Sequence, residues 1–337
     1  MPKNIKSVLL FIIFFLICNS KAFSQSRVFK DVELQVEEEM VLSDHEIFLP
    51  MLLDINRKGE IIFFDFAEYN IVSVNMDDFK FKLFGKGKGR GPGEFSMVMD
   101  LRISDSDDIL FADPRKRKLI EWNLESGFKK EYKLENKHVI PSRIVVCENS
   151  GAVYVLSSRY GKSGIFHKYS RNIKHMVSFQ EKAKRFEKQL PFYTDGEISC
   201  DKDGNLFYAA KYANIIRKYD GKGTLIFETP VYDFEPNEEV IQRNGNFFDL
   251  ADGVRRASGD TRIVDDNLIV GHSGREDAKL ELLDVYSTKD ATYRYSIKMP
   301  HTFQEFVMYK DYIVVLREDG QGEIRLTIYK HDITELF

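Results

Sequence analysis

The chain has 337 residues, of which 30% are charged and 43% hydrophobic, and its formal net charge at pH 7 is −4. Charges of both signs are mixed along it, without the basic face or high isoelectric point that a nucleic-acid-binding protein shows. Glycine and proline fall in turns and form no low-complexity stretch. These features indicate a folded globular protein and argue against a nucleic-acid partner.

The first 24 residues have the features of a secretory signal peptide. Lys3 and Lys6 precede an unbroken apolar stretch at 8–17, and Ala22-Phe23-Ser24 forms a small-x-small cleavage site. The apolar stretch is short for a membrane span. We therefore expect an exported protein without a membrane span, located in the periplasm, at the cell surface or in the medium.

A lipid anchor on Cys18 is the alternative fate of this N-terminus. Lipoprotein signals usually carry a small residue before the cysteine, and Ile17 is large, so we favour cleavage before Gln25. A chain of this length could hold two domains. The repeat described next fills it from end to end, however, and predicts a single domain over 25–337.

One sequence motif, called the repeated phrase below, recurs about every 50 residues, a period typical of solenoids and propellers. It is a polar turn followed by a short apolar run that would form one strand of a hairpin. Its copies are 59–64, 107–112, 151–156, 204–209, 266–271 and 310–315.

Each copy can be extended to four strands. In the fourth copy these are 197–200, 206–210, 215–219 and 224–228, separated by polar turns. A large ring closes the third strand in five copies, as expected of wedges between diverging sheets: Trp122, Tyr169, Tyr219, Tyr286 and Tyr329. The pattern predicts an all-β fold, a six-bladed β-propeller of four-stranded antiparallel blades.

Two other architectures explain the sequence less well. A strand-plus-helix repeat needs an amphipathic helix in every copy, and only 235–242 is a fair candidate. Two β-sandwich domains would not explain the repeated phrase.

The two ends of the chain predict how the ring closes. The last copy ends soon after Tyr329 and lacks an outer strand, whereas 28–35 precedes the first copy and has no partner. We expect this N-terminal strand to complete the last blade, because closure removes exposed sheet edges.

The segment 85–95, Gly-Lys-Gly-Lys-Gly-Arg-Gly-Pro-Gly-Glu-Phe, joins the first copy to the second. Together with the six hairpins, it resembles the exported bacterial six-bladed β-propeller family, which is similar to NHL-repeat propellers. The resemblance covers essentially the whole mature chain. It implies a six-bladed wheel on the exported side of the membrane, and it implies no catalytic motif.

Cys147 and Cys200 each lie four residues before the turn glycine of their copy, so they are equivalent positions in neighbouring repeats. Packed sheets lie about 10 Å apart, farther than the roughly 7 Å between Cα atoms that a disulfide allows. We expect two buried free thiols.

Long connectors share one face of a propeller with the turns between second and third strands, and such a face usually binds the ligand. The glycine-rich connector lies there. Its N–H groups, with Lys88 and Arg90, could hold an anion, although a tight crossover that needs glycine explains it as well. The exposed aromatic residues expected around the mouth are Tyr160, Phe192, Tyr193, Phe247 and Phe248.

Charged residues are expected where the inner strands meet the channel. Arginines flanked by carboxylates could bind an acidic or sugar-like ligand through bidentate contacts; an ion-paired channel that binds nothing is the alternative. The residues are Arg102, Arg143, Glu197, Arg255 and Glu305.

The sequence favours a binding module for a peptide, glycan or partner protein over an enzyme. No nucleophile motif is present, and we predict no cofactor. The alternative is a metal-assisted lyase or hydrolase at the channel mouth, with His272 as the best single ligand. A catalytic zinc needs three protein ligands, and the histidines of this chain show no such spacing.

Overall fold

The computed structural model describes residues 27–333 except 137, 162–163, 181–193, 236, 238–239, 245–246, 252 and 274–278. The expected signal peptide, Cys18, Phe192 and Tyr193 therefore lie outside the described residues. The backbone at Tyr160, Phe247 and Phe248 is described, but their side chains are not.

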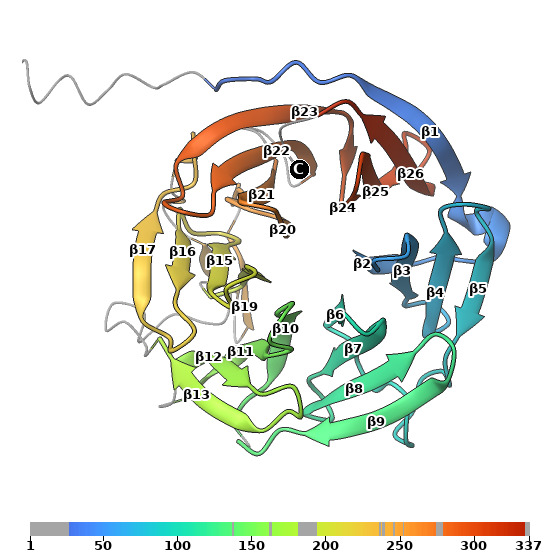
Figure 1. The fold of residues 1–337 in the computed structure, drawn as a ribbon, viewed down its shortest axis with the longest axis vertical. Coiled ribbons are helices and arrows are strands. Elements are labelled where there is room, and N and C mark those ends of the chain that lie inside the picture. The colour runs from blue at the N-terminus through green and yellow to red at the C-terminus, as the bar shows by residue number, and fades with distance from the viewer. Residues whose placement is uncertain are drawn as a thin grey trace, which may run out of the picture.

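The described residues form six four-stranded antiparallel sheets arranged radially around an axis (Figure 1), which confirms the predicted propeller. Each repeated phrase forms the second strand of its blade, and the inner strands surround the axis. The blades are, in order, β2(Pro50–Ile55) to β5(Phe81–Phe84), β6(Asp100–Ile103) to β9(Gly127–Lys133), β10(Pro141–Val146) to β13(His175–Phe179), β14(Gly196–Cys200) to β17(Leu225–Thr229), β20(Thr261–Val264) to β23(Tyr293–Phe303), and β24(Glu305–Tyr309) to β26(Ile324–His331) with β1(Leu34–Val41).

The strands between these inner and outer elements complete the blades. The second strands are buried almost throughout, because each is covered by neighbouring blades on both faces. They are β3(Glu60–Asp65), β7(Asp108–Asp113), β11(Val153–Gly161), β15(Leu206–Ala210), β21(Asn267–His272) and β25(Tyr312–Glu318); the third strands are β4(Asn70–Asn75), β8(Lys118–Asn123), β12(Gly164–Tyr169), β16(Ile216–Tyr219) and β22(Leu280–Ser287), with β26 in the last blade.

The aromatic residues at the ends of the third strands lie between the sheets, as predicted. All five are at most 5% exposed and belong to clusters that join neighbouring blades. Tyr154 adds a further link, since its hydroxyl donates to the carbonyl of Gly204 in the next blade at 2.8 Å. The core is thus a ring of interblade layers.

The N-terminal strand closes the ring, as expected, but it lies later in the chain than the sequence suggested. β1 begins at Leu34 and pairs antiparallel with β26, from Leu34 opposite His331 to Val41 opposite Arg325. The segment before it touches blade 5 through a bridge between Phe29 and Ser296. Apolar alternation runs through both stretches, so the pattern alone did not fix the register.

Glu39 fastens this closing strand to the last blade. Its carboxylate accepts hydrogen bonds from Arg317, from Arg325 Nη1 at 2.9 Å and from Thr327 Oγ1 at 3.2 Å. Arg317 itself is only 6% exposed. One carboxylate therefore compensates a buried guanidinium across the seam of the ring.

Cys147 and Cys200 form a disulfide, which contradicts the expectation of free thiols. Their Cα atoms are 5.2 Å apart. The spacing of about 10 Å applies to sheets packed face to face, whereas Cys147 follows β10 and Cys200 ends β14, where two inner strands converge near the axis. The disulfide therefore joins blades 3 and 4 at their narrow ends.

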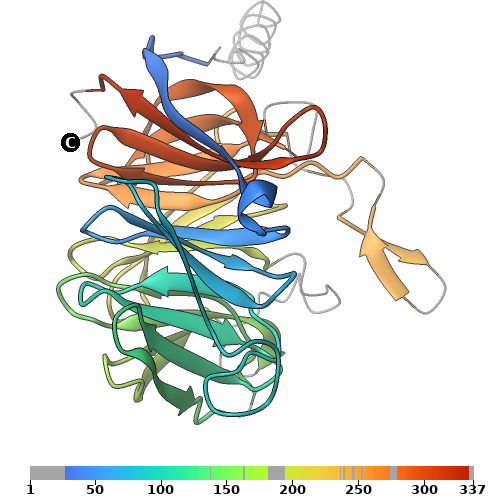
Figure 2. The ribbon, with the colours of Figure 1, turned by 90° about the vertical axis from the view of Figure 1, so that its right-hand side faces the viewer.

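A two-stranded hairpin interrupts the connector between blades 4 and 5. It consists of β18(Ile241–Asn244) and β19(Phe247–Leu250), and Figure 2 shows it projecting from the wheel on the side that also holds the short 3-10 helix η2(Leu42–His45). The possible helix at 235–242 is thus replaced by a strand over its last residues. No helix in the described part of the chain is long and apolar enough to cross a membrane.

Candidate functional site

A cavity of about 720 Å³ opens at the axis on the face that carries the long connectors. Its wall combines the inner strands with the turns and connectors above them. Among the described residues, seven basic side chains line it, against four acidic ones, Asp100, Glu197, Asp260 and Glu305. The basic residues are Lys88, Arg102, Arg115, Arg143, Lys211, Arg256 and Lys279.

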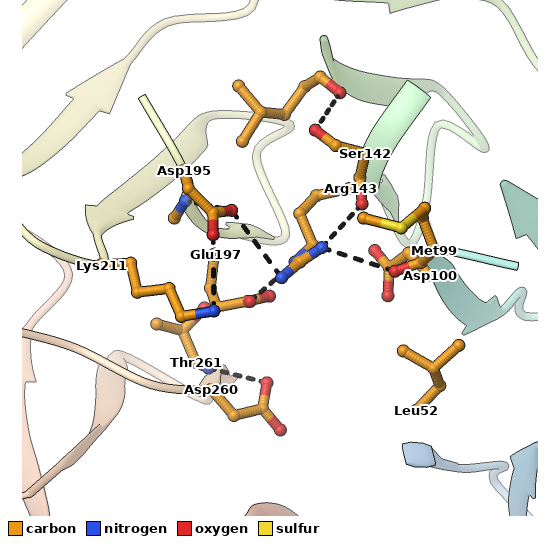
Figure 3. Close-up of polar contacts among 12 residues, drawn as sticks. Leu52, Met99, Asp100, Ser142, Arg143, Asp195, Glu197, Lys211, Asp260 and Thr261 are labelled. Carbon is orange, nitrogen blue, oxygen red and sulfur yellow. Dashed lines mark hydrogen bonds and ion pairs between the residues drawn. The ribbon is translucent and has the colours of Figure 1, made fainter. Parts of the chain in front are cut away.

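Arg143 lines this central cavity, and its contacts are drawn in Figure 3. Its Nε donates to Glu197 Oε1 at 2.7 Å, and Nη1 donates to the carbonyl of Ser142 at 2.8 Å. Nη2 is 3.8 Å from Asp195 Oδ1, and Lys211 Nζ is 3.4 Å from the other oxygen of that carboxylate. Arg143 and Glu197, both predicted to lie at the channel, are therefore brought together, and they form an internal ion pair.

Two further arginines reach across the axis. Arg102, on blade 2, approaches Glu197 on blade 4 with Nη2 to Oε2 at 3.7 Å. Arg262, on blade 5, donates from Nη2 to the carbonyl of Leu53 on blade 1 at 2.7 Å. Side chains therefore bridge blades that are not neighbours in the ring.

Most carboxylates around the axis join one inner strand to the next. The N–H of Ile103 donates to Asp54 Oδ2 at 2.9 Å, and that of Ile144 donates to Asp100 Oδ2 at 2.7 Å. These bonds link blade 1 to blade 2 and blade 2 to blade 3. Each inner strand pairs with another strand on one side only, so the N–H groups on its other edge have no strand partner. Each of these carboxylates accepts one such N–H group.

The same arrangement continues around the ring. Blade 5 is joined to blade 6 by the N–H of Phe306, which lies 3.4 Å from Asp260 Oδ2, and blade 6 to blade 1 by the N–H of Leu52, which lies 3.0 Å from Glu305 Oε1. Between blades 4 and 5, the hydroxyls of Ser199 and Thr261 lie 2.8 Å apart. With Arg143–Glu197 between blades 3 and 4, every junction has a polar link.

Burial changes the protonation of two of these acids. It raises the pKa of Asp100 to about 6 and that of Asp260 to about 7, although nearby arginines oppose the shift. Both groups therefore titrate near neutral pH beside the cavity.

Three of the basic residues in the wall have no carboxylate partner among the described residues: Lys88, Arg115 and Arg256. Lys88 Nζ lies 4.8 Å from the centre of the Tyr69 ring. The connector that carries Lys88 does not leave an open anion cradle, because Glu94 fills it: the N–H of Gly91 donates to Glu94 Oε2 at 2.6 Å. A Cβ at position 89 would clash with the same oxygen, which explains why Gly89 is a glycine.

The remaining predicted residues lie away from the cavity wall. Arg90 is exposed on the connector. Arg255 is not at the channel, because its Nη2 donates to the carbonyl of Glu235 at 3.1 Å and its N–H to Asn237 Oδ1 at 2.9 Å; its neighbour Arg256 lines the cavity instead.

His272 is 1% exposed at the end of β21 and also lies outside the wall. Burial lowers its pKa to about 4, so it is neutral. Neither ring nitrogen has a hydrogen-bond partner of normal geometry among the described residues. No group of three His, Cys, Asp or Glu side chains in that same part of the chain is placed to hold a metal ion.

Sequence reasoning missed Asp100, Asp260, Arg115 and Arg256. A usable signal exists for the first two, since Asp-x-Arg-Ile occurs at both 100–103 and 260–263 at the start of an inner strand. Arg115 and Arg256 lie in a turn and a connector, where no periodicity indicates which side chain faces the axis.

Solved structures with the same fold share little sequence with this chain. A virginiamycin B lyase from Staphylococcus aureus is 15% identical, with a TM-score of 0.54 and 88% of each chain covered. A protein of Bacteroides fragilis described as exported is 14% identical, with a TM-score of 0.53, 88% of this chain covered and 94% of the other. A DUF4221 family member from Bacteroides vulgatus is 11% identical, with a TM-score of 0.54 and coverages of 90% and 99%.

Likeness at these identities shows the fold alone. No curated protein matches the sequence. Residues 50–241, more than half of the chain, match the DUF5128 family, described as a 6-bladed beta-propeller, and the protein therefore belongs to that family.

Proposed function

We propose that this protein is an exported binding module whose central cavity holds an anionic group of a peptide, glycan or partner protein. The observation that carries the proposal is the set of three basic side chains, Lys88, Arg115 and Arg256, that line the cavity without a carboxylate partner among the described residues. The inner arginines, by contrast, are already neutralised by Glu197 and Asp100. An anion would complete the charge balance of the wall.

Two observations support export. A similar structure is that of a Bacteroides fragilis protein described as exported. The disulfide between Cys147 and Cys200 is a bond that persists mainly in oxidising compartments.

Paired anionic and neutral probes test this function. We expect hexaglutamate to bind more tightly than hexaglutamine, or oligogalacturonate more tightly than its methyl ester, in calorimetric titrations at low salt. The double variant Arg115→Gln, Arg256→Gln should weaken the anionic member by roughly tenfold or more, since each lost charge contact contributes on the order of 1 kcal/mol. Arg57→Gln, an exposed arginine in the turn after β2, is the matched control. Equal binding of the neutral probes, or unchanged affinity in the double variant, contradicts the proposal.

Metal analysis of the same preparation addresses the alternative, a metal-assisted lyase or hydrolase. Stoichiometric bound zinc or calcium in the purified protein would favour that alternative over simple binding.

The affinity for an anionic probe should rise as the pH falls from 8 to 5.5. Over this range Asp260 and then Asp100 take up protons, so their repulsion of the anion disappears while the arginines stay charged. The groups around Asp260 are Arg262, Arg102, Glu197 and Glu305. Neutralising one carboxylate beside the bound anion changes the affinity for that anion by up to roughly tenfold.

The variant Asp260→Asn should show a flatter pH profile. Asp266→Asn, at an exposed carboxylate on the opposite face, should keep the wild-type profile and is the control. A wild-type affinity that does not change between pH 8 and 5.5 contradicts this account.

A further inference from the structure

We infer that the ligand of the central cavity is an amphipathic anion, whose charged group meets the basic residues and whose apolar body packs on a wall formed by blade 1 and the connector after it. This inference rests on the proposed function and narrows it, because a purely hydrophilic acidic sugar would leave that wall uncovered.

Besides Phe303 at the end of β23, the apolar part of the lining comes from one consecutive region of the wheel. It includes the inner strand and second turn of blade 1 and the end of the connector to blade 2, and it consists of Met51, Leu52, Phe66, Met97, Val98 and Met99. Met51 is 42% exposed, and Phe66, Met97 and Met99 are half-buried. These side chains therefore present apolar surface to the cavity as well as packing inward.

The apolar surface continues beyond the cavity rim. Phe48 is 57% exposed and Leu49 is 47% exposed, directly before β2. The N–H of Phe66 donates to the carbonyl of Leu49 at 2.9 Å, so the rim and the wall are adjacent. A contiguous exposed apolar patch beside a cavity is typical of a binding surface.

The chemistry of this wall suits an irregular apolar group. Thioether side chains are flexible and polarisable, so three methionines can adapt to different shapes. Leu52 itself adopts a positive φ of 65° at an irregularity in the pairing of β2 with β3, and the carboxylate of Glu305 accepts its N–H. Strained backbone positions that their surroundings hold in place cluster at ligand-binding and active sites. A cavity of about 720 Å³ has the size of a small-molecule site.

Three matched probes separate the two halves of the ligand: 1-naphthoate, 1-naphthalenemethanol and acetate, each titrated calorimetrically at pH 6. We expect naphthoate to bind at least roughly tenfold more tightly than either of the others, because it alone uses both the basic residues and the apolar wall. The double variant Met51→Gln, Met97→Gln should weaken naphthoate by about fivefold or more and leave acetate unchanged. Met176→Gln, at a methionine that is 60% exposed on β13, is the matched control.

The outcomes distinguish this inference from the function on which it rests. If acetate binds as tightly as naphthoate, or the methionine variant binds naphthoate like the wild type, the amphipathic ligand is overturned and anion binding stands. If naphthalenemethanol equals naphthoate, anion recognition itself is overturned. If hexaglutamate, oligogalacturonate and naphthoate all fail to bind, both the inference and the proposed function are overturned.

Discussion

Replacing Cys147 and Cys200 by serine is expected to lower the free energy of unfolding by about 4 kcal/mol, the largest effect of any change considered for this chain. The disulfide closes a loop with a sequence separation of 53 residues and joins two inner strands of neighbouring blades. Without it, the unfolded chain gains the conformational freedom of that loop. Equilibrium unfolding in urea measures the loss.

Reductant provides the control for this prediction. Adding it to the wild-type protein should reproduce the stability of the double serine variant, and adding it to the variant should change nothing. A chain that begins at Gln25 should show no reactive thiol when it is unfolded without reductant. Two reactive thiols under those conditions would contradict the disulfide.

The second large effect is expected at the seam of the ring. Glu39→Gln should lower the free energy of unfolding by about 2–3 kcal/mol, because it leaves the buried guanidinium of Arg317 without its carboxylate. Glu37→Gln, on the exposed side of the same strand, should have little effect.

The difference in stability between the wild type and Glu39→Gln should depend on pH, and its direction follows from the shift in the pKa of Glu39. Burial alone would raise the pKa of Glu39, but hydrogen bonding and charge from Arg317, with Thr327 and Arg325, lower it below its ordinary value of 4.5. A lowered pKa means that the stabilisation is fully present above pH 4.5 and is lost as the pH falls through the folded-state value. The gap between wild type and Glu39→Gln should therefore close in acid; a gap that widens there would be contradictory.

The fold was largely predictable because the sequence repeats the same structural unit several times. Six copies of one phrase determined the number of blades, and a missing outer strand at one end with an unpaired strand at the other predicted closure. The register of that closure was not predictable, since apolar alternation extends over residues on both sides of Leu34.

The candidate site was predictable only in part. Strand residues such as Arg102, Arg143 and Glu305 could be placed near the axis because alternation fixes which side chains of a strand face it. Loop residues could not be placed in this way, as Arg255 and Arg256 show. In an irregular segment no periodic pattern indicates which of two adjacent side chains faces the axis. The cysteines were misjudged because a uniform sheet spacing was applied where the blades taper.

The pairing of β1 with β26 has a consequence for how the molecule is made. The segment that finishes the last blade is synthesised before every other strand of the wheel, and its partner, residues 324–331, is synthesised after them. Until β26 has been made, the sheet edges at both ends of the wheel stay open to other chains, so a product that stops before β26 is vulnerable to aggregation. The ring can therefore close only after the last strand of the wheel has been made.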